Sequence, residues 1–264
     1  AFTVCGNMGY SWQIALLAVF VEGLIFIVLS LTNVREAIFN AIPMALKKGV
    51  SAGIGLFIAF IGLQGANLVV NDDSTLLTYV KFVGDFHTIG IGALLALIGL
   101  FIIVVLHHKN IKGSILIGIL ATWILGMICE AIGLYVPDGK DFYSLYPSFR
   151  MIDFGAFGTT FGQCFNVDFS GVDILNFIAV LFAFLFVDIF DTLGTLIGVS
   201  TKANMLDEEG KLSRIRPALL ADAIATSVGA IFGTSTTTTY VESSAGVAAG
   251  GRTGLSAMVT GLLF

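Results

Sequence analysis

Two aspartates and two threonines fall on one face of a strongly apolar stretch. In FLFVDIFDTLGTLIGVS, Asp188 and Asp191 are three residues apart, and Thr192 and Thr195 lie four and seven residues after Asp188. On an α-helix these positions share a side, and a polar stripe cannot face lipid. It therefore lines a cavity or, alternatively, forms a hydrogen-bond network with another helix. Repulsion and lost hydration favour retention of a proton by one of the two acids, which suits a proton-handling site.

A second polar segment, GTSTTTTYVESSAGVAAGGRTGL at 233–255, also interrupts the apolar sequence. Its β-branched threonines favour extended backbone, and about eight residues are too few to cross a bilayer as a helix. The following residues are sufficient for half a helix that begins near Glu242 and offers free N–H groups to a polar ligand. The alternative is an exposed loop, but Arg252 belongs on the basic side, so the chain must cross between about 233 and 251. Interrupted helices mark the substrate site of many transporters.

Three further acids lie in or near apolar stretches. Asp222 has Thr226 one turn further on, and we expect it to pair with the same network as Asp188. Glu22 lies alone within its stretch, and a hydrogen-bonded packing role is expected for it. Glu130 lies near the end of its stretch, so contact with the membrane interface and a functional role both remain open.

The composition is that of a membrane protein. Hydrophobic residues make up 56% of the chain and charged residues 12%, with a mean hydropathy of +0.95, whereas a soluble domain carries roughly 25% charged residues. Cys5, Cys129 and Cys164 are far apart and form no CxxC pair, so neither a zinc site nor a disulfide framework is predicted. There is no basic patch or motif for nucleic acid, which is therefore not an expected partner.

Apolar stretches of membrane-crossing length recur along the chain, and the charged segments between them alternate in sign. Arg35 and Lys47 belong to the first basic segment, and by the positive-inside rule such segments are cytoplasmic, while 136–171 forms a long outer loop. The last stretch has about half of the ~20 residues needed to cross, and the chain begins with Ala1, so we expect an internal fragment of a longer protein. The stretches are 12–31, 49–66, 84–106, 112–135 and 172–199, followed by shorter ones at 217–232, 240–250 and 255–264.

Several of these stretches resemble a known family. The segment at 233–255, together with FDTLGTLIGVSTKANMLDEEGKLSRIRPALLADAIATSVGA, is similar to the adenine/guanine/hypoxanthine permeases. These form the AzgA-like branch of the nucleobase–cation symporter-2, or nucleobase-ascorbate transporter, superfamily of xanthine/uracil permeases. The resemblance includes two further segments, AFTVCGNMGYSWQIALLAVFVEG and NAIPMALKKGVSAGIGLFIAFIGL. It covers almost the whole chain except 136–171.

The resemblance implies an all-α polytopic membrane fold of fourteen segments in two inverted seven-segment repeats, with a core and a gate domain. The core would contain residues 1–35, which are the end of segment 3 and segment 4, and residues 172–264, which are segments 8 to 11. Residues 36–135 (segments 5 to 7) would belong to the gate, with 136–171 as the outer loop. A short extended strand near 234–241 would lie in the broken segment 10.

Family site residues map onto positions of this sequence. Two substrate-site acids correspond to Asp188 and Glu242; these would accept ring N–H groups of a purine, and Ser243 would donate to an exocyclic oxygen. The implied substrate-binding residues are Asp188, Glu242, Ser243, Thr239 and Phe2, and the implied proton-coupling or supporting residues are Asp191, Asp222 and Thr192. No catalytic residue and no metal site are implied.

The implied function is secondary active uptake of purine nucleobases (guanine, hypoxanthine, adenine) across the cytoplasmic, or plasma, membrane by proton symport with alternating access. The protein would not be an enzyme and would need no cofactor beyond the proton as coupling ion. Its partners would be the nucleobase and the lipid bilayer, with a homodimer as a further possibility.

Three other functions compete with this one. Transport of xanthine, uracil or a small anion would use the same fold, but related branches carry Gln-Asn-Asn-Gly where this chain has its ESS motif. An intramembrane aspartyl protease would need Tyr-Asp and Gly-x-Gly-Asp, and neither occurs. A purely structural membrane protein would not need Glu242 within a broken helix.

Overall fold

The computed structural model describes residues 3–80, 82, 84–137, 144–147, 154–169, 172–207, 211–212 and 214–263. Its contacts divide the chain into two compact units. Unit 1 comprises Ala1–Gly55 and Ile152–Phe264, and unit 2 comprises Leu56–Met151. The assignment of these units to a core and a gate domain stays a prediction.

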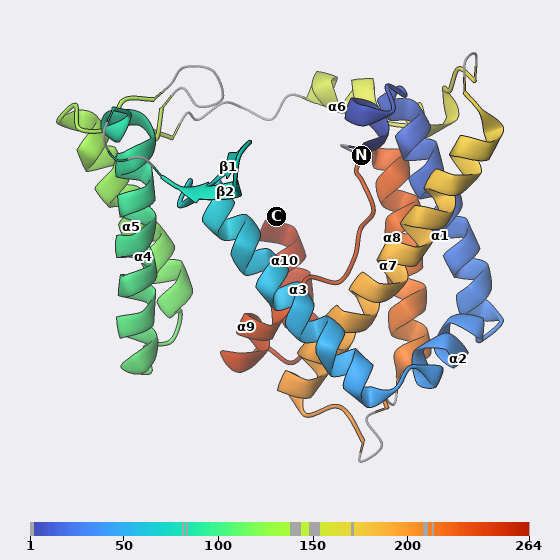
Figure 1. Ribbon diagram of the computed structural model, residues 1–264. Helices are drawn as coiled ribbons and strands as arrows, with labels where there is room; N and C mark the ends of the chain where they lie inside the picture. Colours follow the sequence, from blue (N-terminus) through green and yellow to red (C-terminus); the bar gives the residue numbers. More distant parts are fainter. Residues whose placement is uncertain are drawn as a thin grey trace. The chain divides into compact units, whose positions relative to one another are not determined.

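Six helices in the described part of the chain are long and apolar enough to cross a membrane, which confirms the expected all-α, multi-pass membrane protein. The third combines the π-helical turn η2 (Phe86–Gly90) with α4 (Ile91–His108). The others are α1 (Trp12–Leu31), α3 (Met44–Gly65), α5 (Ser114–Ala131), α7 (Ile174–Ala203) and α8 (Ile215–Phe232). Figure 1 shows them in sequence colours.

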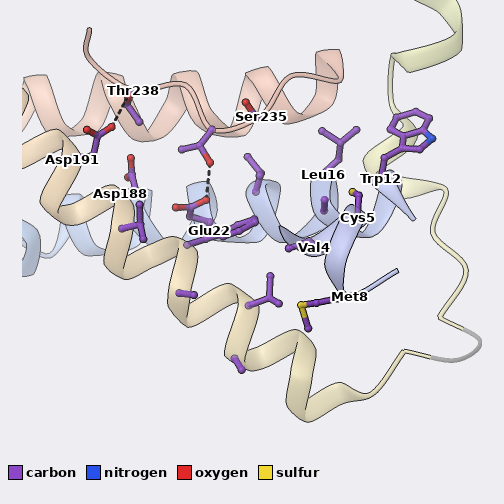
Figure 2. Close-up of a pocket in the computed structure, with 18 of the residues that line it drawn as sticks. Val4, Cys5, Met8, Trp12, Leu16, Glu22, Asp188, Asp191, Ser235 and Thr238 are labelled. Carbon is purple, nitrogen blue, oxygen red and sulfur yellow. Dashed lines mark hydrogen bonds between the residues drawn. The ribbon is translucent and has the colours of Figure 1, made fainter. Parts of the chain in front are cut away.

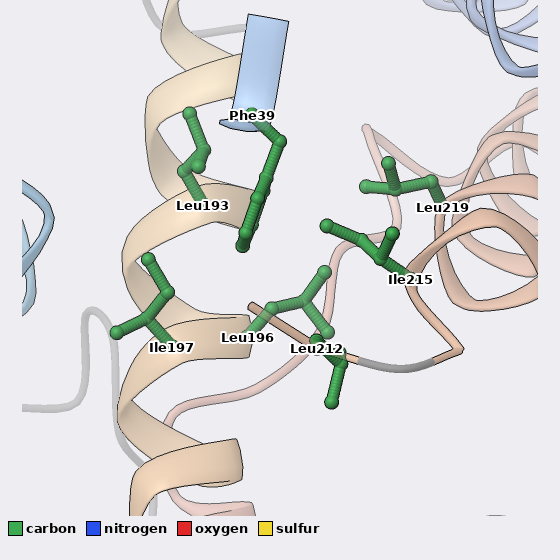
Figure 3. Packing of buried hydrophobic residues seen from close by; sticks show 7 residues of the cluster. All are labelled: Phe39, Leu193, Leu196, Ile197, Leu212, Ile215 and Leu219. Carbon is green, nitrogen blue, oxygen red and sulfur yellow. The ribbon is translucent and has the colours of Figure 1, made fainter. Parts of the chain in front are cut away.

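Unit 1 is built around the packing of α1 against α8 and α7 (Figure 1). Gly23 makes the close approach of α1 to α8 possible, because a Cβ there would lie 2.8 Å from the backbone nitrogen of Ser227. The short helix α2 (Val34–Ala41) follows α1 and buries Phe39. Figure 3 shows the apolar cluster that joins α2, α7 and α8: Phe39, Leu193, Leu196, Ile197, Leu212, Ile215 and Leu219.

The chain beyond α8 is interrupted as expected. Residues 234–240 form no helix and join no sheet within the described part of the chain. The short helix α9 (Ser243–Ala248) follows and packs against α7, and α10 (Gly254–Leu263) comes next. We call residues 234–242 the connection. The predicted half-helix is therefore present, with six residues.

The region predicted as one long outer loop contains regular structure. Helix α6 (Phe154–Thr160) and the 3-10 turn η3 (Gln163–Phe165) lie within it. Cys164 is fully buried, and the Phe165 ring meets the Phe20 ring of α1 edge-on at 5.1 Å. Part of this segment therefore belongs to the packing of unit 1.

Unit 2 contains the helix pair α4 and α5 and a small hairpin that the sequence analysis did not predict. Its antiparallel strands are β1 (Val69–Asp72) and β2 (Leu76–Tyr79). Glu130, near the end of α5, accepts hydrogen bonds from Ser144 Oγ at 2.6 Å and from the backbone nitrogen of Leu145 at 2.8 Å. The structure therefore gives Glu130 a role that was not considered, which is to hold the segment at 144–145 against α5. Neither of the two roles left open for it is tested.

Replacing Gly23 by valine should separate α1 from α8, because the new side chain would meet the backbone of Ser227. The expected cost is about 1–3 kcal/mol, as for other overpacked sites, measured as a lower thermal unfolding midpoint of the full-length protein in detergent. Gly53→Val is the matched control, since a Cβ at Gly53 meets nothing within 4 Å. Equal losses in the two variants would contradict the close-packing argument.

Candidate functional site

A cavity of about 790 Å³ lies within unit 1, a volume typical of small-molecule sites. Its walls come from the π-helical turn η1 (Thr3–Asn7), α1, α7 and the segment at 233–238. Figure 2 shows two different ends. One carries Glu22, Asp188 and Asp191, and the other carries apolar and sulfur-containing side chains together with Trp12.

The connection supplies hydroxyl groups to the acidic end. Thr236 Oγ1 donates to Glu22 Oε2 at 3.2 Å, and Thr238 Oγ1 donates to Asp191 Oδ2 at 3.2 Å (Figure 2). Alternate residues of an extended segment point to the same side, which explains why positions two apart both reach the acids. The Thr-rich segment thus donates one hydrogen bond to a carboxylate on each of two helices, to the buried Glu22 on α1 and the half-buried Asp191 on α7.

Helix α8 holds the connection in place. Thr226 Oγ1 donates to the backbone oxygen of Thr237 at 2.8 Å. One turn further on, Gly229 leaves room for the connection, because a Cβ there would lie 2.6 Å from Thr237 Oγ1 and 2.7 Å from Thr234 Oγ1. Non-helical backbone at membrane depth requires such support from protein.

Asp188 belongs to a buried ion cluster at the edge of the cavity. Arg35 Nη2 lies 3.2 Å from Asp188 Oδ2 and 3.0 Å from Asp222 Oδ2. Thr192 Oγ1 lies 3.3 Å from Asp188 Oδ1 and 3.3 Å from Asp222 Oδ2, so it bridges the two acids. Asp188 lines the cavity and Asp222 does not. The cluster therefore connects a cavity acid on α7 with a supporting acid on α8.

Arg35 lies between two membrane-length helices, as the sequence predicted, but its burial was not predicted. It lies in α2 and is only 3% exposed. Its carboxylate partners are 153 and 187 residues away in sequence, so no local pattern shows the pairing. The available signal was its place four residues before Phe39, on the face that α2 buries.

Glu22 lines the cavity in addition to forming the hydrogen bond that was expected for it. The expected hydrogen bond exists, to Thr236, but the residue lines the cavity as well. Its side chain is fully buried, and Oε1 has no hydrogen-bond partner among the residues that the structure describes. Spacing gave no hint of this role, because Glu22 has no polar neighbour on its own helix face.

The structure brings together only some of the residues implied for the site. Asp188 and Asp191 line the cavity, and Thr192 and Asp222 lie behind them in the ion cluster. Three other implied residues, Thr239, Glu242 and Ser243, do not line it, and the last two are exposed at the start of α9. Phe2 lies outside the described residues.

No metal site stands out in the described part of the chain, where no three His, Cys, Asp or Glu side chains are grouped to hold an ion. The arrangement instead offers carboxylate acceptors beside an apolar wall. It suits a small ligand that has N–H donors and apolar surface.

Comparison with known proteins identifies the family. A model of the Permease family matches residues 1–264. The chain belongs to this family. Membership of a permease family agrees with the expectation of a transport protein.

Several relatives of this permease-family chain carry substrate names. The guanine/hypoxanthine permease PbuG of Bacillus subtilis is 45% identical over 254 residues, which cover 96% of this chain and 53% of that protein. A putative permease of Methanocaldococcus jannaschii is 44% identical over 253 residues, with the same coverage of 96% and 53%. The adenine permease AdeQ of Escherichia coli is 36% identical over 266 residues, covering 100% of this chain and 54% of that protein. The chain thus spans about half the length of the curated relatives it matches.

Replacing Thr236 by valine should destabilise the protein, because it leaves the Glu22 carboxylate without its hydroxyl donor. A buried acceptor left unpaired costs about 1–3 kcal/mol, seen as a lower thermal midpoint of the full-length protein. Thr234→Val is the control, since Thr234 belongs to the same segment and is exposed. The hydrogen bond carries no stability if both variants unfold at the wild-type temperature.

Proposed function

We propose that the full-length protein takes up purine nucleobases across the cytoplasmic membrane as a secondary active transporter, by proton symport with alternating access. The observation that carries the proposal is the acidic end of an otherwise apolar cavity, set among membrane-length helices. The names of the guanine/hypoxanthine and adenine permeases among the relatives support a purine as the substrate.

A purine suits the acidic end of the cavity and the apolar walls beside it. Its ring and exocyclic N–H groups would donate to Asp188 and to neighbouring carboxylates, and such hydrogen bonds to charged acceptors are the stronger ones. Its flat faces would lie against the apolar side chains that line the cavity beside the acids. Glu242 and Ser243, exposed at the start of α9, remain proposed contacts that would need the base to extend beyond the cavity or α9 to approach it.

The carboxylates at the acidic end of the cavity favour some of the competing substrates over others. Three carboxylates at the polar end would repel an anion, so a small anion is the least suited ligand. Xanthine and uracil also carry N–H donors, and their transport is the second candidate. Proton coupling is supported by the grouping of acids around Asp188, because repulsion between neighbouring carboxylates favours a proton on one of them, which could be taken up and released during transport. Movement of core against gate would expose the site to each side in turn.

Uptake of radiolabelled hypoxanthine, guanine, adenine and uracil tests this proposal, in cells that lack their own nucleobase transporters. We expect saturable purine uptake that a protonophore abolishes. Asp188→Asn should abolish uptake with the protein still present at the membrane, and Glu242→Ala should do the same. Asp73→Asn, an exposed acid in the hairpin of unit 2, is the control and should transport as wild type does. Absence of uptake of every base would refute the proposal.

Cys5 provides a separate test of where the base binds. It is partly exposed and lines the cavity, whereas Cys129 is partly exposed on α5 in unit 2. Saturating hypoxanthine should slow alkylation of Cys5 by a maleimide by at least about threefold, as burial of a reactive group by a ligand does, and leave Cys129 unchanged. Mass spectrometry of the labelled full-length protein reads both sites. Equal labelling rates with and without base would show that the bound base does not cover the end of the cavity that carries Cys5.

A further inference from the structure

Arg35 is fixed by the helix that carries it. Arg35 and Phe39 lie four residues apart and therefore on one side of α2. Phe39 is 2% exposed and packs into the cluster formed with α7 and α8 (Figure 3). The apolar contact anchors α2, and the side chain one turn earlier is thereby directed between the same two helices.

The guanidinium is held on every side. Besides its two carboxylate partners, Arg35 donates from Nη1 to the backbone oxygen of Leu219 on α8 at 3.1 Å. Its Cζ lies 4.0 Å from the centre of the Phe26 ring on α1. A planar fork of donors that also stacks on an aromatic ring is a property of arginine, and a lysine ammonium cannot reproduce it.

The two acids that Arg35 joins are not equivalent. Asp188 lines the cavity and Asp222 lies behind it. Arg35 and Thr192 engage one oxygen each of Asp188. A carboxylate has about four lone-pair sites, so Asp188 is fixed in orientation and keeps acceptor capacity for a ligand. In the described part of the chain, Arg35 is the only basic side chain in an ion pair with either acid.

We propose that Arg35 is a positioning residue for substrate binding, which holds the Asp188 carboxylate in the orientation that accepts an N–H group of a purine base. Asp222 holds the guanidinium from the other side, and Arg35 itself does not contact the base. This inference rests on the proposed function, because it requires Asp188 to bind the base. It makes α2 part of the binding site although no residue of α2 lines the cavity.

A positioning role and a merely structural role for Arg35 predict different substrate affinities for a variant that lacks the guanidinium but keeps the charge balance of the cluster. Arg35→Gln alone leaves two buried carboxylates without their cation and should lower the thermal midpoint. The double variant Arg35→Gln/Asp222→Asn removes one positive and one negative charge together, and two amides can still hydrogen-bond. Stability should then return towards wild type, while Asp188 still lacks the group that orients it.

The experiment measures the dissociation constant for radiolabelled hypoxanthine and the thermal midpoint side by side, on monodisperse full-length protein in detergent. The set comprises wild type, both single variants, the double variant and Lys47→Gln. Lys47 is the matched control, because it is a buried cation that lies 4.4 Å from the Phe39 ring and forms no ion pair with Asp188 or Asp222. We expect the double variant to recover its midpoint and to bind hypoxanthine at least about tenfold more weakly, as a mis-oriented charged acceptor does. Lys47→Gln should bind as wild type does.

Wild-type affinity in the stable double variant would overturn the inference, since Arg35 would then serve stability alone. If the double variant does not recover, Arg35→Lys decides, because it keeps the charge and loses the fork. Weakened binding by folded Arg35→Lys supports positioning, and unchanged binding overturns it. Failure of the wild type to bind any purine would instead overturn the proposed function and remove the basis of this inference.

Discussion

Buried polar groups need partners wherever helices are long and apolar enough to lie in a membrane, and unit 1 is organised by that need. Glu22 on α1 and Asp191 on α7 accept hydroxyl hydrogen bonds from the connection. Arg35 on α2 joins Asp188 on α7 to Asp222 on α8. The two members of each pair come from different elements, so these pairs fix how four helices and one non-helical segment pack together.

Apolar packing and polar pairing cooperate at the same helices. The cluster around Phe39 sets α2 against α7 and α8, and the ion cluster lies one turn away from it. The close contact of Gly23 with Ser227 brings α1 near enough for Glu22 to face the connection. The cavity that results has a polar end built by long-range pairs and an apolar end built by η1 and the start of α1.

Much of this arrangement could be predicted from sequence where the signal is local. Hydropathy located the membrane helices, and the three-residue spacing of Asp188 and Asp191 placed both acids on one face, now seen at the cavity. Threonine content located the break after α8. Arg35 could not be found in this way, because it was counted with the basic residues between helices and both its partners lie more than 150 residues away. Glu22 was missed as a cavity residue for the same reason, since its donor lies 214 residues further on.

The sequence separation of the ion cluster also constrains how the protein is made. When α1 and α2 leave the ribosome, the acids that pair with Arg35 have not yet been synthesised, and the guanidinium has no carboxylate partner at its later position. An unpaired arginine is costly within a bilayer and favours the water interface. Helices α1 and α2 must therefore wait, with α2 at the membrane surface, until α7 and α8 have been inserted. Assembly of unit 1 is then completed only after α8 has been made, by the docking of a charged helix that was synthesised long before it.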